Sequence, residues 1–124
     1  NVEIADGFFK GWPNPPDKIK HRKILENSFV SIVAIDEDKN QIIGFINVIS
    51  DGILSAYIPL LEVVEGYQGA GIGSKLVELA LDEIKDFYMV DLSCDEDMIP
   101  FYEKFNMHPG IAMILRNYAS QAGV

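Results

Sequence analysis

The chain has 124 residues and a formal net charge of −9, from 19 acidic and 10 basic side chains. This length fits one domain with its own core and is short for two, so we expect a single domain over residues 1–124. The acidic balance disfavours nucleic acid as the main partner, and no apolar stretch approaches the ~20 residues that cross a bilayer. Cys94 is the single cysteine, which excludes an internal disulfide and predicts a reducing, cytoplasmic setting with a buried thiol.

The N-terminal part predicts helices separated by a proline-rich loop. Residues 2–10 have the composition of a short helix that ends at Gly11, and the three prolines of residues 12–16 predict an ordered loop. Asp17 is a candidate N-cap for a helix that continues through Glu26. The basic cluster on that helix, residues 18–23 with His21, is expected to be a solvated face.

The middle of the chain predicts an antiparallel meander of three strands. Residues 29–35 and 42–49 are apolar runs joined by a charged turn, and Asp51-Gly52 predicts a two-residue hairpin into a long strand over 53–64. Pro59 lies within that strand and predicts a bulge or an edge position there.

The second half alternates helices and strands. Apolar residues at helical spacing predict a helix over 72–87, followed by a strand over 87–94 and a short helix over 98–105. A final strand is expected over 111–115, and residues 117–124 are expected to fray. Together with the meander, this order predicts an α/β fold with a mixed sheet.

A glycine-rich turn at residues 66–73 separates the third strand from the long helix. Gly69, Gly71 and Gly73 leave nearby backbone N–H groups unshielded at a helix start, where unpaired donors and the helix dipole favour an anion. The physical chemistry therefore predicts a phosphate-bearing ligand at this turn.

Spacing separates three kinds of phosphate-binding loop. A P-loop beginning at Gly66 would need Lys and Ser or Thr where Ile72 and Gly73 stand. The dinucleotide fingerprint would need a glycine at Ser74, although Asp91 lies at a suitable distance for that fold, so an oxidoreductase stays a minor alternative. The pattern Gln/Arg-x-x-Gly-x-Gly/Ala fits without adjustment at Gln68, Gly71 and Gly73.

That third pattern resembles the acyl-CoA motif of the GNAT superfamily of N-acyltransferases. Residues 95–107, Asp-Glu-Asp-Met-Ile-Pro-Phe-Tyr-Glu-Lys-Phe-Asn-Met, resemble the second signature of the family, and the run from Cys94 to Pro109 is closest to the arylalkylamine branch. That branch uses histidines upstream on the third strand, where this chain has Tyr57-Ile58-Pro59, which puts an arylalkylamine substrate in doubt.

The resemblance implies a GNAT-like, mostly antiparallel mixed sheet that splays between the fourth and fifth family strands, with helices on both faces. The first family strand has no counterpart before Val2. Either upstream residues were removed, or residues 2–4 pair along the strand at 29–35, or a second copy of the chain does so, as a homodimer would.

The resemblance also implies the site. The acyl donor is acetyl-CoA, with its pantetheine arm along Leu61 and Val63 and its pyrophosphate on Gln68, Gly69, Ala70, Gly71, Ile72, Gly73 and Ser74. Tyr102 matches the tyrosine that protonates the leaving thiolate, and a phenol is acidic enough for that step. Glu62 alternates with its apolar neighbours, so it faces the other layer as the candidate base or as a solvated charge.

The function expected from these features is N-acetyl transfer from acetyl-CoA to a primary amine, either a small molecule or a lysine-like acceptor, in a ternary complex. A metal is not expected, since the family needs none and residues 95–97 resemble a metal site in composition only. The alternative is a non-catalytic acyl-CoA sensor or interaction module on the same fold.

Overall fold

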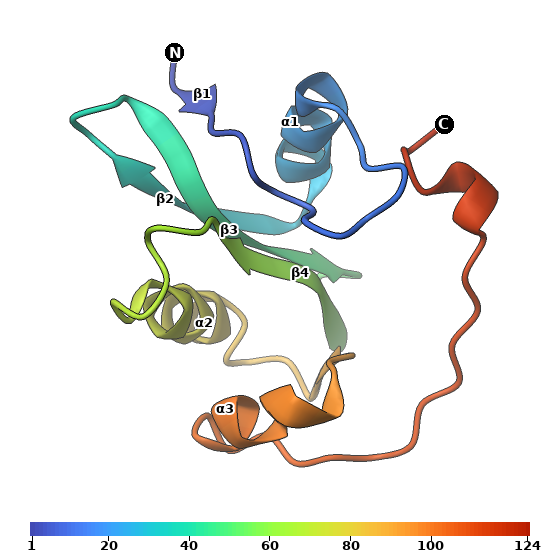
Figure 1. Cartoon of the computed structure of the whole chain (residues 1–124). Coiled ribbons are helices and arrows are strands. Elements are labelled where there is room, and N and C mark those ends of the chain that lie inside the picture. The colour runs from blue at the N-terminus through green and yellow to red at the C-terminus, as the bar shows by residue number, and fades with distance from the viewer.

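The computed structural model describes residues 1–124, and Figure 1 shows their arrangement. The strands are β1 (Glu3–Ile4), β2 (Val30–Asp36), β3 (Gln41–Ser50), β4 (Ser55–Val63) and β5 (Met89–Leu92). The α-helices are α1 (Lys18–Asn27), α2 (Ile72–Glu83) and α3 (Ile99–Glu103), with short 3-10 turns at Glu96–Met98 and Tyr118–Ser120. None of these helices is long and apolar enough to cross a membrane.

The five strands form one mixed sheet, as the sequence predicts. β2, β3 and β4 are antiparallel neighbours, whereas β1 pairs in parallel with β3 and β5 in parallel with β4. β2 pairs with β3 from Gln41 to Val48 and occupies one edge of it. β1 and β4 therefore share the other edge, where β1 pairs with Gln41 and Ile42 and β4 begins its pairing at Gly44. The fold is the GNAT-like α/β architecture.

Helices cover both faces of the sheet, α1 on one side and α2 on the other (Figure 1). Alternation along β3 divides its side chains between the two layers: Ile46 and Val48 pack with α2 in the larger core cluster, which also includes Val77 and Ala80. Phe45 points the other way, with its ring centroid 4.5 Å from that of His21 on α1. The apolar face of α2 is therefore buried against β3, and this packing, more than intrinsic helix propensity, stabilises the helix.

β4 and β5 separate partway along their length. Their pairing runs from Ser55–Met89 to Ile58–Leu92, whereas β4 continues to Val63 beside β3 alone. Ile58 and Pro59 together oppose one residue of β3, so β4 carries an extra residue where the strands part. The predicted bulge at Pro59 is confirmed, and it marks the start of the splay.

The predicted N-terminal helix is wrong. Residues 3–4 form β1, and the chain then bends through Gly7 and Phe9, whose φ values are 103° and 58° and are incompatible with a right-handed helix. β1 pairs with β3 and not with β2, which excludes one of the three alternatives, the pairing of residues 2–4 along residues 29–35. Asp17 does cap α1, accepting a hydrogen bond of 2.8 Å from the Lys20 N–H.

The predicted two-residue hairpin at Asp51-Gly52 is also wrong. Strand β3 ends at Ser50 and β4 begins at Ser55, so four residues make the connection. The Asp51 carboxylate accepts N–H bonds from Ile53, Leu54 and Ser55, at 2.9, 2.9 and 3.2 Å. These bonds stabilise a wider loop than a turn of two residues provides.

The C-terminal part lacks the strand expected for it. Residues 111–115 are not a strand: they pass outside the sheet, from α3 toward α1, and Ile111 and Met113 are 100% and 95% exposed (Figure 1). A strand requires a hydrogen-bonded neighbour, and no strand of the chain pairs with this segment. After this segment, Tyr118–Ser120 form a 3-10 turn, and the Gln121 side chain accepts a bond of 2.9 Å from the Asn14 N–H, so this end of the chain contacts the N-terminal loop.

Candidate functional site

The splay leaves one edge of β4 open to ligands. The Val64 N–H donates to the Ile43 carbonyl of β3 at 2.9 Å, so the carbonyl of Val63, in the same peptide unit, faces away from β3. The same alternation directs the main-chain groups of Leu61 toward the open side. A ligand beside β4 therefore meets the N–H groups of Leu61 and Val63 as an added strand would.

The glycine turn connects this edge to α2. Gly66, Gly69 and Gly71 have φ values of 93°, 82° and 83°, and nothing lies within 4 Å of the position of a Cβ on any of them. Gly71 precedes α2, whose first N–H groups have no partners within the helix. The turn thus presents bare backbone donors and open space at a helix N-terminus, as an anion site requires.

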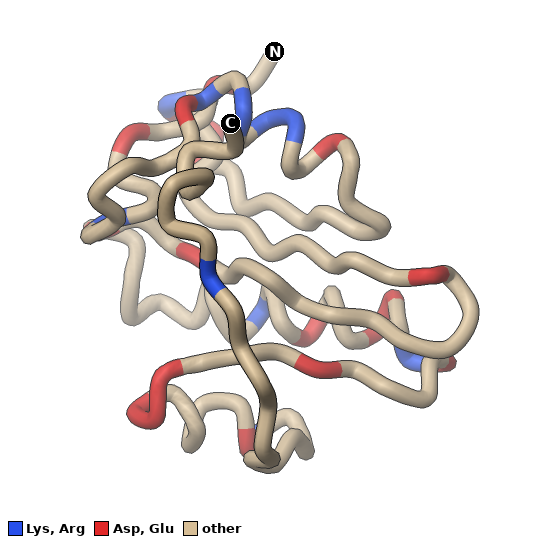
Figure 2. Tube along the Cα trace, turned by 90° about the vertical axis from the view of Figure 1, so that its right-hand side faces the viewer, with Lys and Arg blue, Asp and Glu red and all other residues tan.

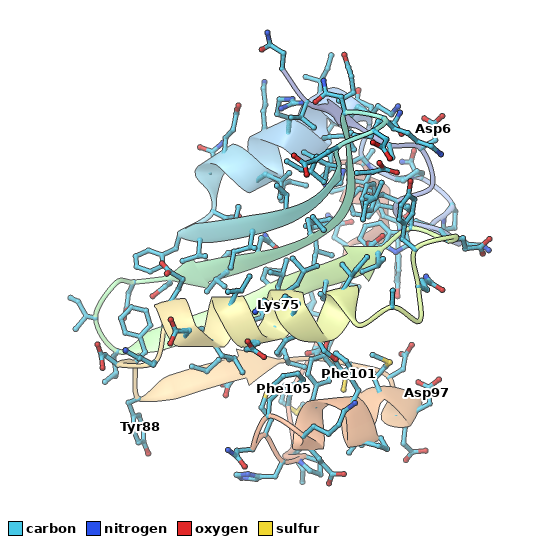
Figure 3. All side chains as sticks on the ribbon, turned by 90° about the vertical axis from the view of Figure 1, so that its left-hand side faces the viewer. Asp6, Lys75, Tyr88, Asp97, Phe101 and Phe105 are labelled. Atoms are coloured by element: carbon cyan, nitrogen blue, oxygen red, sulfur yellow. The ribbon has the colours of Figure 1, made fainter.

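Gly73 differs in conformation from the three glycines before it. Its φ is not positive, and a Cβ there would lie 4.0 Å from Cζ of Phe101 on α3. Figure 3 shows α3 beneath α2, with Phe101 and Phe105 labelled between the two helices. A Cβ at that distance would make an ordinary van der Waals contact, so the packing of α3 against α2 does not itself require glycine at position 73.

Two side chains fix the turn in place. The Gln68 amide Nε2 donates to the Val63 carbonyl at 2.8 Å, and the Tyr67 hydroxyl donates to the Asp36 carboxylate at the end of β2. Ala70 is exposed between the glycines, whereas Ile72 packs beneath the turn against both core clusters. Ser74 is half-buried in the first turn of α2.

Glu62 lies on the α1 side of β4, the layer in which the sequence predicts it. Its Oε1 accepts a bond of 2.7 Å from the Phe9 N–H. Burial raises the pKa of this carboxyl above its ordinary value, and the Phe9 bond opposes that rise. A half-buried carboxylate that retains its proton at higher pH is a better acceptor of protons near neutrality than an exposed one.

A pocket of about 320 Å³ lies beside Glu62. It includes two of the open-edge residues, Leu61 and Val63, together with Gln68 from the turn. The N-terminal segment supplies the opposite wall. The full lining is Gly7, Lys10, Trp12, Leu61, Glu62, Val63, Glu65 and Gln68. Sequence-predicted residues from the strand and the turn thus meet in one hollow.

Tyr102 lies on α3 and does not line that pocket. Its ring packs against the larger core cluster and lies edge-on to Phe101, at 4.9 Å between centroids. Burial raises the pKa of the Tyr102 phenol, and the negative charge that Cys94 carries as a thiolate adds to the rise. Since Cys94 follows β5, the phenol belongs to the β5 side of the splay and Glu62 to the β4 side.

The sequence failed to indicate several residues of this region. Phe9 holds Glu62 through a backbone N–H, which no side-chain pattern reveals. His21 is 2% exposed and its Nε2 has no hydrogen-bond partner, so the basic cluster is not wholly solvated. Burial lowers the pKa of His21 to about 4, and the charge of Arg22 has a smaller effect in the same direction. Cys94 is exposed, contrary to the buried thiol predicted, because its strand stops at Leu92.

The charges of the molecule are unevenly distributed. Lys and Arg gather around α1 and the N-terminal segment, and acidic residues dominate near α3 (Figure 2). Near the pocket, Lys10 pairs with Glu65, and Nζ of Lys75 on α2 lies 3.2 Å from Oε1 of Glu78. No group of three or more His, Cys, Asp or Glu side chains is placed to hold a metal ion.

Comparisons with known proteins agree with this architecture. A sequence model described as the Acetyltransferase (GNAT) family matches residues 2–107. An uncharacterized, ycf52-like N-acetyltransferase of Prochlorococcus marinus is 30% identical over 97 residues, which are 75% of this chain and 53% of that protein. The chain thus spans about half the length of that curated relative.

Two solved structures share both sequence and fold with the chain. A candidate acetyltransferase of Deinococcus radiodurans R1 is 50% identical, with a TM-score of 0.92 over 96% of this chain and 82% of that one. A GNAT family acetyltransferase of Streptococcus pneumoniae TIGR4 is 29% identical, with a TM-score of 0.66 over 82% of this chain and 83% of the other.

Proposed function

The chain belongs to the GNAT family of acetyltransferases, and we propose that it transfers the acetyl group of acetyl-CoA to a primary amine by direct attack in a ternary complex. The observation that carries this proposal is the open edge of β4. Leu61 and Val63 direct main-chain groups into the splay, and they also line the pocket that contains Glu62. Donor and acceptor can therefore meet at one strand edge without a covalent enzyme intermediate.

The donor would bind along the turn and the strand. The pyrophosphate of CoA accepts hydrogen bonds from the backbone of residues 68–74, where the glycines admit it closely. The pantetheine arm extends beside β4 as an added strand and meets the N–H groups of Leu61 and Val63. One of these N–H groups then polarises the thioester carbonyl, on which negative charge develops during attack.

The proton transfers assign roles to Glu62 and Tyr102. Glu62 takes a proton from the ammonium of the acceptor, directly or through water, and the freed amine nitrogen attacks the thioester carbon. The new C–N bond forms and the C–S bond breaks as Tyr102 gives its proton to the leaving thiolate. The phenolate recovers a proton from the nitrogen of the intermediate, and Glu62 releases its proton to solvent. The products are an amide, CoA and one proton.

The acceptor is proposed more coarsely than the donor. Both a small-molecule amine and a lysine-like side chain fit the chemistry. The signature at residues 95–107 alone places the chain nearest the arylalkylamine branch of the family. The exposed pocket beside Glu62 is the proposed point of entry for the acceptor.

Turnover with acetyl-CoA over a panel of amines tests this proposal. Release of free CoA thiol, measured together with the mass of the acetylated product, should require both substrates and should show intersecting initial-rate lines. Tight binding of acetyl-CoA without transfer to any amine or lysine peptide would instead support a non-catalytic sensor. Parallel lines with an acetylated protein would contradict direct transfer.

A further inference from the structure

The pocket beside Glu62 contains the single tryptophan of the chain. Trp12 is partly exposed and lines the pocket with Glu62 and Val63. Its backbone N–H donates to the Phe9 carbonyl at 3.0 Å, and its ring lies 4.8 Å from that of Phe9, which is 4% exposed. The indole is therefore held by a buried residue, and that same residue holds the Glu62 carboxylate through its N–H.

The charges of the pocket leave one carboxylate without a cationic partner. Lys10, Glu62 and Glu65 are the charged residues of the lining. Lys10 and Glu65 form an ion pair with each other, so their charges compensate. The hydrogen-bond partner of Glu62 is the Phe9 N–H, which donates to Oε1, and no cation pairs with this carboxylate. The pocket therefore carries a net charge of about −1 next to an aromatic wall, which favours one cation.

We infer that Trp12 and Glu62 together recognise the ammonium group of the acceptor, which is a singly cationic alkylamine or aralkylamine without an acidic group. This inference rests on the proposed function, because it assigns the pocket to the acceptor. The indole attracts the cation through its π face, and the carboxylate attracts it by charge before accepting its proton. An acidic substituent would meet the uncompensated charge of Glu62 and would be repelled.

A binding measurement without an acyl donor tests the site directly. Since Trp12 is the only tryptophan, its fluorescence reports the pocket alone. The wild-type protein is titrated with choline, a quaternary ammonium ion, and with its uncharged carbon isostere. We expect a saturable change in fluorescence with choline and none with the isostere. An equal response to the two, or no response to choline, would overturn the inference.

Variants separate the contribution of the Trp12 ring to choline binding from that of the Glu62 charge, with the affinity measured by calorimetry. Trp12→Leu should weaken binding ~2- to 30-fold, the range for a cation–π contact, whereas Trp12→Phe should retain part of the affinity. Glu62→Gln should weaken binding, and Lys10→Met should tighten it by releasing the charge of Glu65. Unchanged affinity in Trp12→Leu, or weaker binding in Lys10→Met, would contradict the assignment.

Measuring the acetylation of amines distinguishes a failure of cation recognition by Trp12 and Glu62 from a failure of the proposed acetyltransferase function. If choline binds as expected but no amine is acetylated, the cation site stands and the proposed function fails. If amines are acetylated with choline as a competitive inhibitor, both stand. If acidic amines are acetylated as well as cationic ones and Trp12→Leu leaves KM unchanged, the function stands and the recognition by Trp12 fails.

Discussion

The side-chain amide of Gln68 lies 2.8 Å from the carbonyl oxygen of Val63 and donates a hydrogen bond to it. This bond joins the first residue of the proposed acyl-CoA motif to the last residue of β4, across the exposed turn. The carbonyl is one of the main-chain groups that face the splay, so the bond occupies an acceptor there and leaves the Val63 N–H for the ligand. The position of the turn relative to the strand edge thus depends on Gln68.

Gln68→Ala should weaken CoA binding ~2- to 10-fold, the value of one exposed hydrogen bond, with little change in melting temperature. Gln68→Glu should weaken it further, because a carboxylate cannot donate to Val63 and adds a negative charge beside the pyrophosphate. Calorimetric titration with CoA checks both. Equal affinity of Gln68→Glu and wild type would exclude this role for Gln68.

CoA and acetyl-CoA should stabilise the folded protein, and NAD and ATP should do so much less. A ligand at 100 times its Kd adds about 2.7 kcal/mol, which raises the melting temperature of a domain of this size by several degrees. Differential scanning fluorimetry at matched concentrations measures the shift. A larger shift with NAD than with CoA would show that the turn at Gly69 and Gly71 serves a dinucleotide.

Gly71→Val should abolish CoA binding while the fold persists. Gly71 has a φ of 83°, so a side chain strains the backbone, and the Cβ would stand in the open space where the pyrophosphate approaches. Gly52→Val is the matched control, since its φ is 77° and it lies in the loop between β3 and β4, away from the turn. Both variants should lose stability, and only Gly71→Val should lose CoA. Native affinity in Gly71→Val would reject the site.

Patterns of local chemistry predicted the parts of the site that lie close together in sequence. The meander, α2 and the bulge at Pro59 follow from apolar periodicity and proline geometry, and the turn follows from glycine spacing. The contact of Phe9 with Glu62 escaped prediction because it spans 53 positions and is made by a backbone N–H, in a turn where Phe9 has a positive φ. The strand expected at 111–115 is absent because an apolar run does not by itself specify a strand, and this segment pairs with no strand of the sheet.

Tyr102→Phe should lower kcat by ~10²- to 10⁴-fold and leave CoA affinity nearly unchanged. The phenyl ring preserves the packing against Phe101 and the core cluster, so stability should hold. An acyl donor with a better leaving group needs less protonation, so the defect should shrink with it. Tyr118→Phe, at an exposed tyrosine far along the chain, is the control. A Tyr102→Phe enzyme with wild-type turnover would assign Tyr102 to packing alone.

Glu62→Gln should reduce kcat/KM at neutral pH, since the amide cannot take the proton of the acceptor. In the wild type, kcat/KM should rise with pH through the raised pKa of Glu62, because only the carboxylate is a base. In Glu62→Gln that rise should disappear from the pH profile, whereas Glu37→Gln, at an exposed turn, should retain it. A profile that keeps the same inflection in Glu62→Gln would assign the base to another group.

The same variant should be more stable than the wild type at neutral pH, because it removes the cost of a half-buried carboxylate charge. Burial raises the pKa of Glu62 in the folded state above its ordinary value of 4.5, so the native state binds the proton more tightly than the unfolded state. Stability of the wild type therefore falls as pH rises through the window between 4.5 and the raised pKa, and the cost is fully present above it. The amide oxygen of a glutamine at this position would still accept the Phe9 N–H bond without that cost.

Denaturant unfolding at several pH values should show Glu62→Gln gaining stability above the window, with the gain vanishing below pH 4.5. The wild type supplies the reference at each pH, and Glu37→Gln, at its exposed turn, should show no such gain. A Glu62→Gln variant that is destabilised at neutral pH would contradict this prediction. It would mean that the Glu62 carboxylate stabilises the fold, so that the site carries no cost in stability.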